Sequence, residues 1–162
     1  YIAQFILFLI INKMEHKKEE LGWILAKAGQ LSILSFDVDK FPLGVVEDYI
    51  KYLQEKENVG TAIIIESSNF HYHIYFFWSL LEWEKIQEII QYCPIADPLF
   101  KNFTKRNGFI RMRISNLYKP HLKIIKNNKN MDFDLGDFYF KHYLYLLGFA
   151  PETIKYYLEE IR

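Results

Sequence analysis

Hydrophobic and polar positions along the chain follow two different periods, and each period predicts a different kind of element. Short runs of apolar and β-branched residues, bounded by polar residues, are typical of buried strands. A strict alternation of apolar and basic residues predicts a half-buried strand. Together these patterns predict five strands, at residues 31–38, 61–65, 72–78, 109–115 and 122–126.

Apolar residues spaced three and four positions apart predict helices between these strands. Asp97 and Pro98 are typical of a helix N-cap and first turn, and Gly108 is placed to end that short helix. The predicted helices lie at residues 43–56, 81–92, 98–107, 137–147 and 151–161, the last two hinged at Gly148.

The order of elements from residue 31 to residue 115 is therefore β-α-β-β-α-β, with one extra short helix before the last strand. This order predicts an α+β fold of the ferredoxin-like or RNA-recognition-like kind, with an antiparallel sheet, helices on one face and a C-terminal helical pair. In that topology the strand at 31–38 has the strand at 72–78 on one side and the strand at 109–115 on the other. Many activities use this arrangement, so function must be argued from residues.

The 162 residues are enough for one well-cored domain. Residues 1–13 are predicted to be an apolar N-terminal extension, too short to span a bilayer, which needs about 20 apolar residues. Residues 14–130 would form the main domain, and residues 131–162 a helical hairpin packed on it. The single cysteine, Cys93, cannot form an internal disulfide, which favours a reducing, cytoplasmic compartment and no membrane partner.

Charge is distributed unevenly although the net charge is zero. Residues 101–129 contain nine basic residues and no acidic one, whereas the rest of the chain is acidic. The zero net charge excludes a global attraction to nucleic acid or to an anionic membrane. Any anionic partner is therefore expected to bind locally.

Two carboxylates flank Val38 at the end of the first predicted strand. Asp37 and Asp39 are two positions apart, so both side chains point to the same side of the strand. Like charges so close repel unless they share a proton or a cation, and Mg²⁺ or Mn²⁺ prefers such oxygen ligands. The pair is therefore a candidate metal site, although acidic pairs are also common where strands run out into turns.

The hairpin after the second predicted strand carries polar side chains that face the same way. His71 and His73 share one face of the third predicted strand. Because that strand is expected to lie beside the first, His73 is predicted to approach Asp37 and Asp39. Basic residues that follow, Arg111 and Arg113 on one strand and Lys123 on the next, are candidate phosphate ligands.

These motifs together resemble the catalytic core of the archaeo-eukaryotic primase superfamily. SFDVDK resembles the first motif of that family, IIIESSNFHYHIYFF is similar to the second, and ADPLFKNFTKRNGFIRMRIS resembles the region that leads into a later basic strand. The resemblance covers about residues 31–126.

The resemblance implies a metal-dependent nucleotidyltransferase, a DNA primase or polymerase using Mg²⁺ or Mn²⁺. Asp37, Asp39 and His73 would be catalytic, with the two aspartates as metal ligands. Ser68, His73, Arg111, Arg113 and Lys123 would bind the nucleotide phosphates. The implied partners are nucleoside triphosphates, a single-stranded DNA template or primer-template, and a replication helicase.

The chain departs from the family pattern at two places. Asn69, Phe70 and His71 replace the usual glycine-rich turn before the histidine. The third carboxylate is not fixed by the pattern: Asp97 is one candidate, although it looks more like a helix cap, and Asp132 and Asp134 are others.

Two other functions remain open from the residues. His71-Tyr72-His73 also resembles the His-hydrophobe-His motif of rolling-circle endonucleases and single-strand transposases, in which two histidines hold one metal and a helical tyrosine attacks DNA. Tyr139, Tyr143 and Tyr145 are the helical tyrosines available for that role. The second is a catalytically inactive nucleic-acid-binding module that stacks bases on exposed aromatic side chains.

Overall fold

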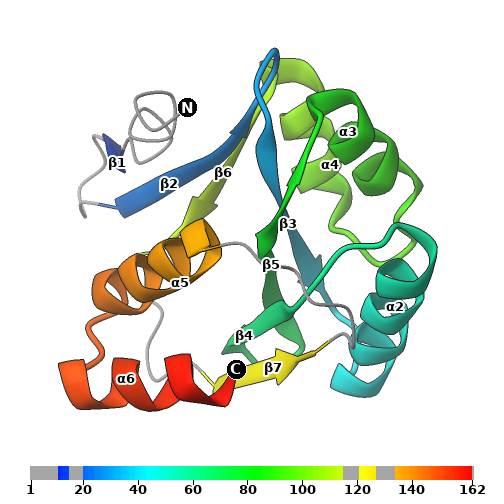
Figure 1. The fold of residues 1–162 in the computed structure, drawn as a ribbon. Coiled ribbons are helices and arrows are strands. Elements are labelled where there is room, and N and C mark those ends of the chain that lie inside the picture. The colour runs from blue at the N-terminus through cyan, green and yellow to red at the C-terminus, as the bar shows by residue number, and fades with distance from the viewer. Residues whose placement is uncertain (1–10, 15–19, 115–120, 127–133, 162) are drawn as a thin grey trace.

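The computed structural model describes residues 11–14, 20–114, 121–126 and 134–161 (Figure 1). Its strands are β1 (Ile11–Met14), β2 (Glu20–Lys27), β3 (Ser32–Asp39), β4 (Ala62–Ser68), β5 (His71–Leu81), β6 (Phe109–Arg113) and β7 (His121–Ile125). Its helices are α2 (Leu43–Lys56), α3 (Trp83–Tyr92), α4 (Pro98–Asn107), α5 (Asp134–Leu146) and α6 (Pro151–Glu160).

The strands form two antiparallel sheets within these described ranges. The larger has the order β3-β5-β4-β7 and the smaller the order β1-β2-β6. The central strand β5 pairs with β3 on one edge and with β4 on the other. Nearly all of β5 is buried, in keeping with its continuous apolar and aromatic sequence. The ends of β3 and β5 that carry Asp37, Asp39 and the two histidines therefore lie side by side.

Helices cover both faces of the larger sheet. Alternation along β5 places Phe76 on the face covered by α2, where Phe36 contacts both Phe76 and Tyr49 of α2. Tyr75 and Phe77 point the opposite way and contact Tyr143 of α5. Figure 1 shows α2 and α5 on opposite sides of β5. Phe36 and Tyr75 thus belong to two separate halves of the core.

Helix α4 begins and ends as its sequence predicts. The Asp97 side chain accepts a hydrogen bond from the Phe100 N–H at 3.1 Å, and Pro98 follows as the first helical residue. Gly108 ends the helix with φ of 69°, a left-handed conformation that glycine adopts without a steric penalty. The Asp97 cap fixes the residue at which α4 begins, next to the edge of β3.

The predicted fold class is confirmed: the chain is α+β, its sheets are antiparallel, and α5 and α6 form a C-terminal helical pair. The predicted placement of the helices on one face is wrong, because α2 and α5 cover opposite faces of the larger sheet. The predicted pairing of the basic strand is wrong. β6 pairs with β2 and not with β3. Trp23 on β2 lies opposite Met112 on β6 and is fully buried, so residues 20–27 supply an apolar partner strand that the sequence pattern did not reveal.

The N-terminal boundary predicted at residue 13 falls inside a strand. β1 pairs with β2, with Ile11 opposite Trp23 and Met14 opposite Glu20. Residues 1–10 lie outside the described residues. Among the described helices, none combines the length and the apolar character needed to cross a bilayer.

Candidate metal centre

The candidate site lies at the end of β3, on the face of the larger sheet that α5 covers. The register pairs Asp37 with His73 and Asp39 with His71. Val38 between the two aspartates is fully buried on the α2 side, so alternation turns both carboxylates to the other side. The predicted proximity of Asp37, Asp39 and His73 is therefore observed.

Asp97 brings a third carboxylate to this pair from the free edge of β3. Ala96 forms a bridge with Val38, and the Asp97 N–H donates to the Asp37 carbonyl oxygen at 2.8 Å. One carboxylate oxygen each of Asp37, Asp39 and Asp97 lies within 4.8 Å of the others. All three residues are half-buried and reach solvent. Three hard oxygen ligands at this separation are suited to Mg²⁺ or Mn²⁺, so the triad could hold a metal ion.

Each histidine lies next to a different carboxylate. Nδ1 of His71 is 2.5 Å from Oδ1 of Asp39, and Nε2 of His73 is 3.7 Å from Oδ1 of Asp37. The His71 side chain is 40% exposed, whereas that of His73 is 8% exposed. His73 is therefore the histidine built into the protein interior, and His71 stands at the solvent edge.

Burial and charge crowding change the protonation of the two inner groups. Burial raises the pKa of Asp37 to about 7, with further contributions from the negative charges of Asp39 and Asp97. The pKa of His73 is lowered to about 4, mainly by burial and secondly by the positive charge of Arg113. At neutral pH His73 is thus uncharged, while Asp37 is poised to lose its proton to a bound cation.

Tyr75 is a member of the site that the sequence analysis missed. Its hydroxyl lies 3.4 Å from Nδ1 of His73, and the residue is fully buried. When the phenol donates to Nδ1, the remaining proton of neutral His73 sits on Nε2, the nitrogen that faces Asp37. The signal was present in the alternation of His71, His73 and Tyr75, which places all three on one strand face.

Known proteins give no assignment for this arrangement. No family model, curated protein or solved structure matches the chain. The site must therefore be interpreted from its own geometry.

The two arginines of β6 stand in different relations to the carboxylates. Arg113 is close enough for its charge to lower the pKa of both Asp37 and His73. The Arg111 guanidinium carbon instead lies 6.0 Å from the centre of the Phe103 ring on α4. Both residues sit on the same face of β6, but only Arg113 is near the carboxylates.

Two of the predicted phosphate ligands are placed apart from the triad. Lys123 pairs in register with Ile64, on the α2 face, and its Nζ lies 3.6 Å from Oε1 of Glu47 on α2. It therefore lies on the opposite face of the sheet, and its predicted place beside the carboxylates is wrong. Ser68 is exposed at the end of β4, opposite His71. It borders the site through that histidine.

The other candidates for a third carboxylate do not join the triad among the described residues. Asp134 is the exposed first residue of α5 and is not in an extended strand. Asp132 lies outside the described residues. Asp97 therefore fills the position that the sequence analysis left open, and it does so while also capping α4.

The tyrosines needed by a rolling-circle nuclease are mostly inaccessible. Tyr139 and Tyr143 are buried in the α5 interface, and Tyr145 is 69% exposed. Each histidine lies beside its own aspartate rather than sharing one site with the other histidine. These positions favour the carboxylate triad, rather than a histidine pair, as the metal-binding group.

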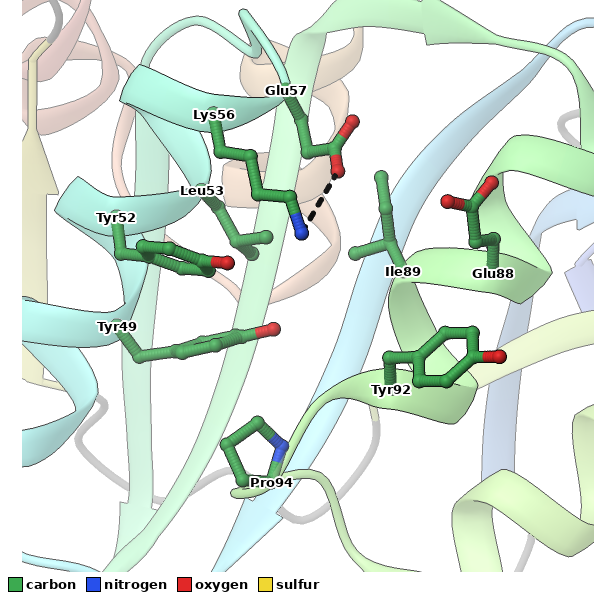
Figure 2. A pocket seen from close by; sticks show the side chains of 9 residues that line it. All are labelled: Tyr49, Tyr52, Leu53, Lys56, Glu57, Glu88, Ile89, Tyr92 and Pro94. Atoms are coloured by element: carbon green, nitrogen blue, oxygen red, sulfur yellow. Dashed lines mark ion pairs between the residues drawn. The ribbon is translucent and has the colours of Figure 1, made fainter.

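A pocket of about 340 Å³ lies between α2 and α3, on the sheet face opposite the triad (Figure 2). Tyr49 and Tyr52 project into it from α2, and Tyr92 lines it from the end of α3. The Lys56 ammonium is 4.0 Å from Glu57 and 5.5 Å from the centre of the Tyr52 ring. Because it lies on the opposite face of the sheet, the pocket adds nothing to the candidate metal centre.

Proposed function

We propose that this protein is a divalent-metal-dependent nucleotidyltransferase of the primase-polymerase type. The observation that carries the proposal is the convergence of Asp37, Asp39 and Asp97 within 4.8 Å, beside the neutral, buried His73. The substrates would be nucleoside triphosphates and a single-stranded template or primer-template.

The donor set fits Mg²⁺ or Mn²⁺. Three carboxylates supply hard oxygen ligands. The pKa of Asp37 is raised by burial and then by the negative charges of Asp39 and Asp97, and a bound cation would offset both effects. A bound divalent ion would neutralise triphosphate charge and lower the pKa of a primer hydroxyl. Asp37, Asp39 and Asp97 would hold it.

The surrounding residues position the substrate. In the tautomer that carries its proton on Nε2, His73 can donate to a phosphate oxygen at the place where it now faces Asp37. Tyr75 holds the imidazole orientation through Nδ1. Arg113 supplies positive charge next to the carboxylates, where a triphosphate would need it. Ser68, at the hairpin, is the candidate polar contact at the outer rim of the site.

Primer extension by the purified full chain tests the proposal. Wild-type protein is expected to add deoxynucleotides to a primed single-stranded template in Mn²⁺ and to lose this activity in EDTA. Asp37→Asn and Asp39→Asn remove one charge each with little change in shape and are expected to reduce the rate by at least about a hundredfold, as is usual when a group that stabilises transition-state charge is lost. Asp48→Asn, an exposed carboxylate on α2, is the matched control and should retain activity.

Three results would argue against the proposal. Wild-type protein that neither binds Mn²⁺ nor extends a primer would indicate a module without catalysis. Equal activity in wild type and Asp37→Asn would place the chemistry elsewhere. A covalent protein-DNA adduct would instead support the rolling-circle mechanism.

A further inference from the structure

The chain between Pro98 and Ile114 is strongly basic, and both of its ends lie near the carboxylate triad. This stretch, called here the α4–β6 segment, contains five basic residues, Lys101, Lys105, Arg106, Arg111 and Arg113, and no carboxylate. Asp97, a member of the triad, immediately precedes it, and its last basic residue, Arg113, acts electrostatically on Asp37. The segment therefore leaves the candidate metal centre at Asp97 and returns toward it at Arg113.

Arg111 is held in place by neighbours on both sides. Its guanidinium carbon is 6.0 Å from the centre of the Phe103 ring, and Phe103 is itself fixed by an edge-to-face contact with Phe109. Its aliphatic part crosses Gly22 of β2: a Cβ added at Gly22 would lie 2.7 Å from Cδ of Arg111. The absence of a side chain at Gly22 thus makes the space that Arg111 occupies.

Such an arrangement suits the recognition of phosphate. An arginine held by an aromatic ring and a strand loses less conformational entropy on binding than a free surface lysine. Its planar guanidinium can form two parallel hydrogen bonds with one phosphate group. The α4–β6 segment itself contains no carboxylate that could neutralise the charge of Arg111.

Apolar side chains near Arg111 indicate that the ligand is a single-stranded nucleic acid. Leu99, Phe103 and Arg106 follow one another at helical spacing on one side of α4, and Leu99 is 78% exposed. Unpaired bases offer apolar faces to such side chains, whereas a duplex keeps its bases stacked inside. The pairing of basic and apolar groups on this surface therefore fits a single-stranded nucleic acid.

We infer that the α4–β6 segment binds the backbone of a single-stranded nucleic acid, with Arg111, set between Phe103 and Gly22, as the anchor. The inference deepens the proposed function. It rests on that proposal only for the role of the bound nucleic acid, which would run past the triad as template or primer. Binding itself requires no metal, so the two proposals fail independently.

Fluorescence anisotropy with a labelled oligothymidylate, recorded in EDTA over a range of KCl concentrations, tests this inference. Arg111→Gln is expected to weaken binding about three- to tenfold and to reduce the slope of log affinity against log salt by about 0.7, the value for one phosphate contact on a single strand. Arg111→Lys keeps the charge but loses the planar group, so its affinity is expected to lie between those of wild type and Arg111→Gln.

Gly22→Ala tests whether the position of Arg111 matters as well as its charge. The added methyl group displaces the Arg111 side chain but removes no charge. It is expected to weaken binding as Arg111→Gln does. Gly44→Ala is the matched control, since a Cβ there meets no atom within 4 Å, and Lys51→Gln on α2 is the charge control. Both controls should bind within twofold of wild type, and circular dichroism confirms that each variant is folded.

The inference is overturned if Arg111→Gln binds like wild type, or if Lys51→Gln loses as much affinity as Arg111→Gln. It is also overturned if polyglutamate competes as well as oligothymidylate, because the surface would then attract any polyanion. Should Gly22→Ala fail to fold, the comparison of Arg111→Gln with Arg111→Lys decides. Binding that survives in a protein without metal-dependent extension would retain this inference and reject the proposed function.

Discussion

The backbone N–H of Asp97 donates to the carbonyl oxygen of Asp37 at 2.8 Å. This one hydrogen bond joins two residues 60 positions apart in the sequence and sets the third carboxylate beside the Asp37–Asp39 pair. The same Asp97 side chain caps α4 through Phe100. The start of α4 and the composition of the candidate metal centre are therefore fixed by the same residue.

This double role can be separated by two substitutions at Asp97. Asp97→Asn keeps a good N-cap but removes the charge, so it should weaken Mn²⁺ binding at least about tenfold with little loss of stability. Asp97→Ala should weaken Mn²⁺ binding equally and also lose about 1 kcal/mol of unfolding free energy with the cap. Titration calorimetry and urea unfolding measure the two effects. Unchanged Mn²⁺ affinity in Asp97→Asn would exclude Asp97 as a ligand.

Metal binding should depend on pH around neutrality. A cation must displace the proton of Asp37, whose pKa is raised to about 7 by burial and by Asp39 and Asp97. Mn²⁺ affinity is therefore expected to fall by up to about tenfold per pH unit below 7 and to level off above it. Calorimetry at several pH values tests this. In Asp37→Asn the pH dependence near 7 should disappear together with most of the affinity.

Without metal, Asp37 and His73 should give opposite contributions to stability. The folded pKa of Asp37, about 7, lies above the ordinary 3.8, so its contribution to the unfolding free energy rises as pH falls from 7 toward 4. The folded pKa of His73, about 4, lies below the ordinary 6.5, so its contribution decreases as pH falls from 6.5 toward 4. The two effects largely cancel in wild type.

Single substitutions should expose each contribution. Relative to wild type, Asp37→Asn is expected to lose stability on acidification below pH 6.5, and His73→Gln to gain it over the range from 7 to 4. Urea unfolding in EDTA at a series of pH values measures both. Parallel pH profiles for wild type and the two variants would show that neither group has a shifted pKa.

Gly136, the single glycine of α5, should not tolerate a side chain. A Cβ at this position would lie 2.2 Å from Cδ1 of Trp78, and the indole is held in place by a 3.0 Å hydrogen bond to Asp137. Gly136→Ala is expected to cost about 1–3 kcal/mol of unfolding free energy through overpacking. Gly44→Ala, which meets open space, should leave stability unchanged or slightly higher. Equal melting temperatures for both variants would contradict this packing.

Arg113 and Lys123 should differ in their effect on nucleotide binding, although both were candidates from the sequence. Arg113→Gln removes a charge felt at Asp37 and is expected to weaken binding of a nucleoside triphosphate about tenfold. Lys123→Gln removes a charge paired with Glu47 on the opposite face and should bind within about twofold of wild type. Titration with a non-hydrolysable triphosphate in Mn²⁺ distinguishes the two.

Local pattern was sufficient for most of the helices and strands. The spacing of apolar residues located α2, and Asp97, Pro98 and Gly108 located both ends of α4. Alternation along β3 and β5 predicted which side chains share a face with Asp37. These features depend on interactions within a few residues, or between strands joined by a short hairpin, and so they are legible in the sequence.

The pairing of strands that are distant in the sequence could not be predicted in the same way. The strand at 20–27 has no clear period, so β6 was assigned to the wrong neighbour, and Lys123 to the wrong face with it. Asp97 looked like a helix cap because that is one of its two roles. Whether the capping carboxylate of Asp97 also lies beside those of Asp37 and Asp39 depends on how the start of α4 packs against the edge of β3. That packing is set only in the folded chain.

The amino-acid sequence by itself determined the α+β class, the pair of helices at the C-terminal end of the chain and the shared face of Asp37, Asp39, His71 and His73. Only the tertiary structure decided that Asp97 completes the triad, that β6 joins β2, and that Gly22 makes room for Arg111. The physical reason is that side-chain direction follows from local backbone period, whereas the meeting of remote segments follows from how buried surfaces such as Trp23 against Met112 fit together.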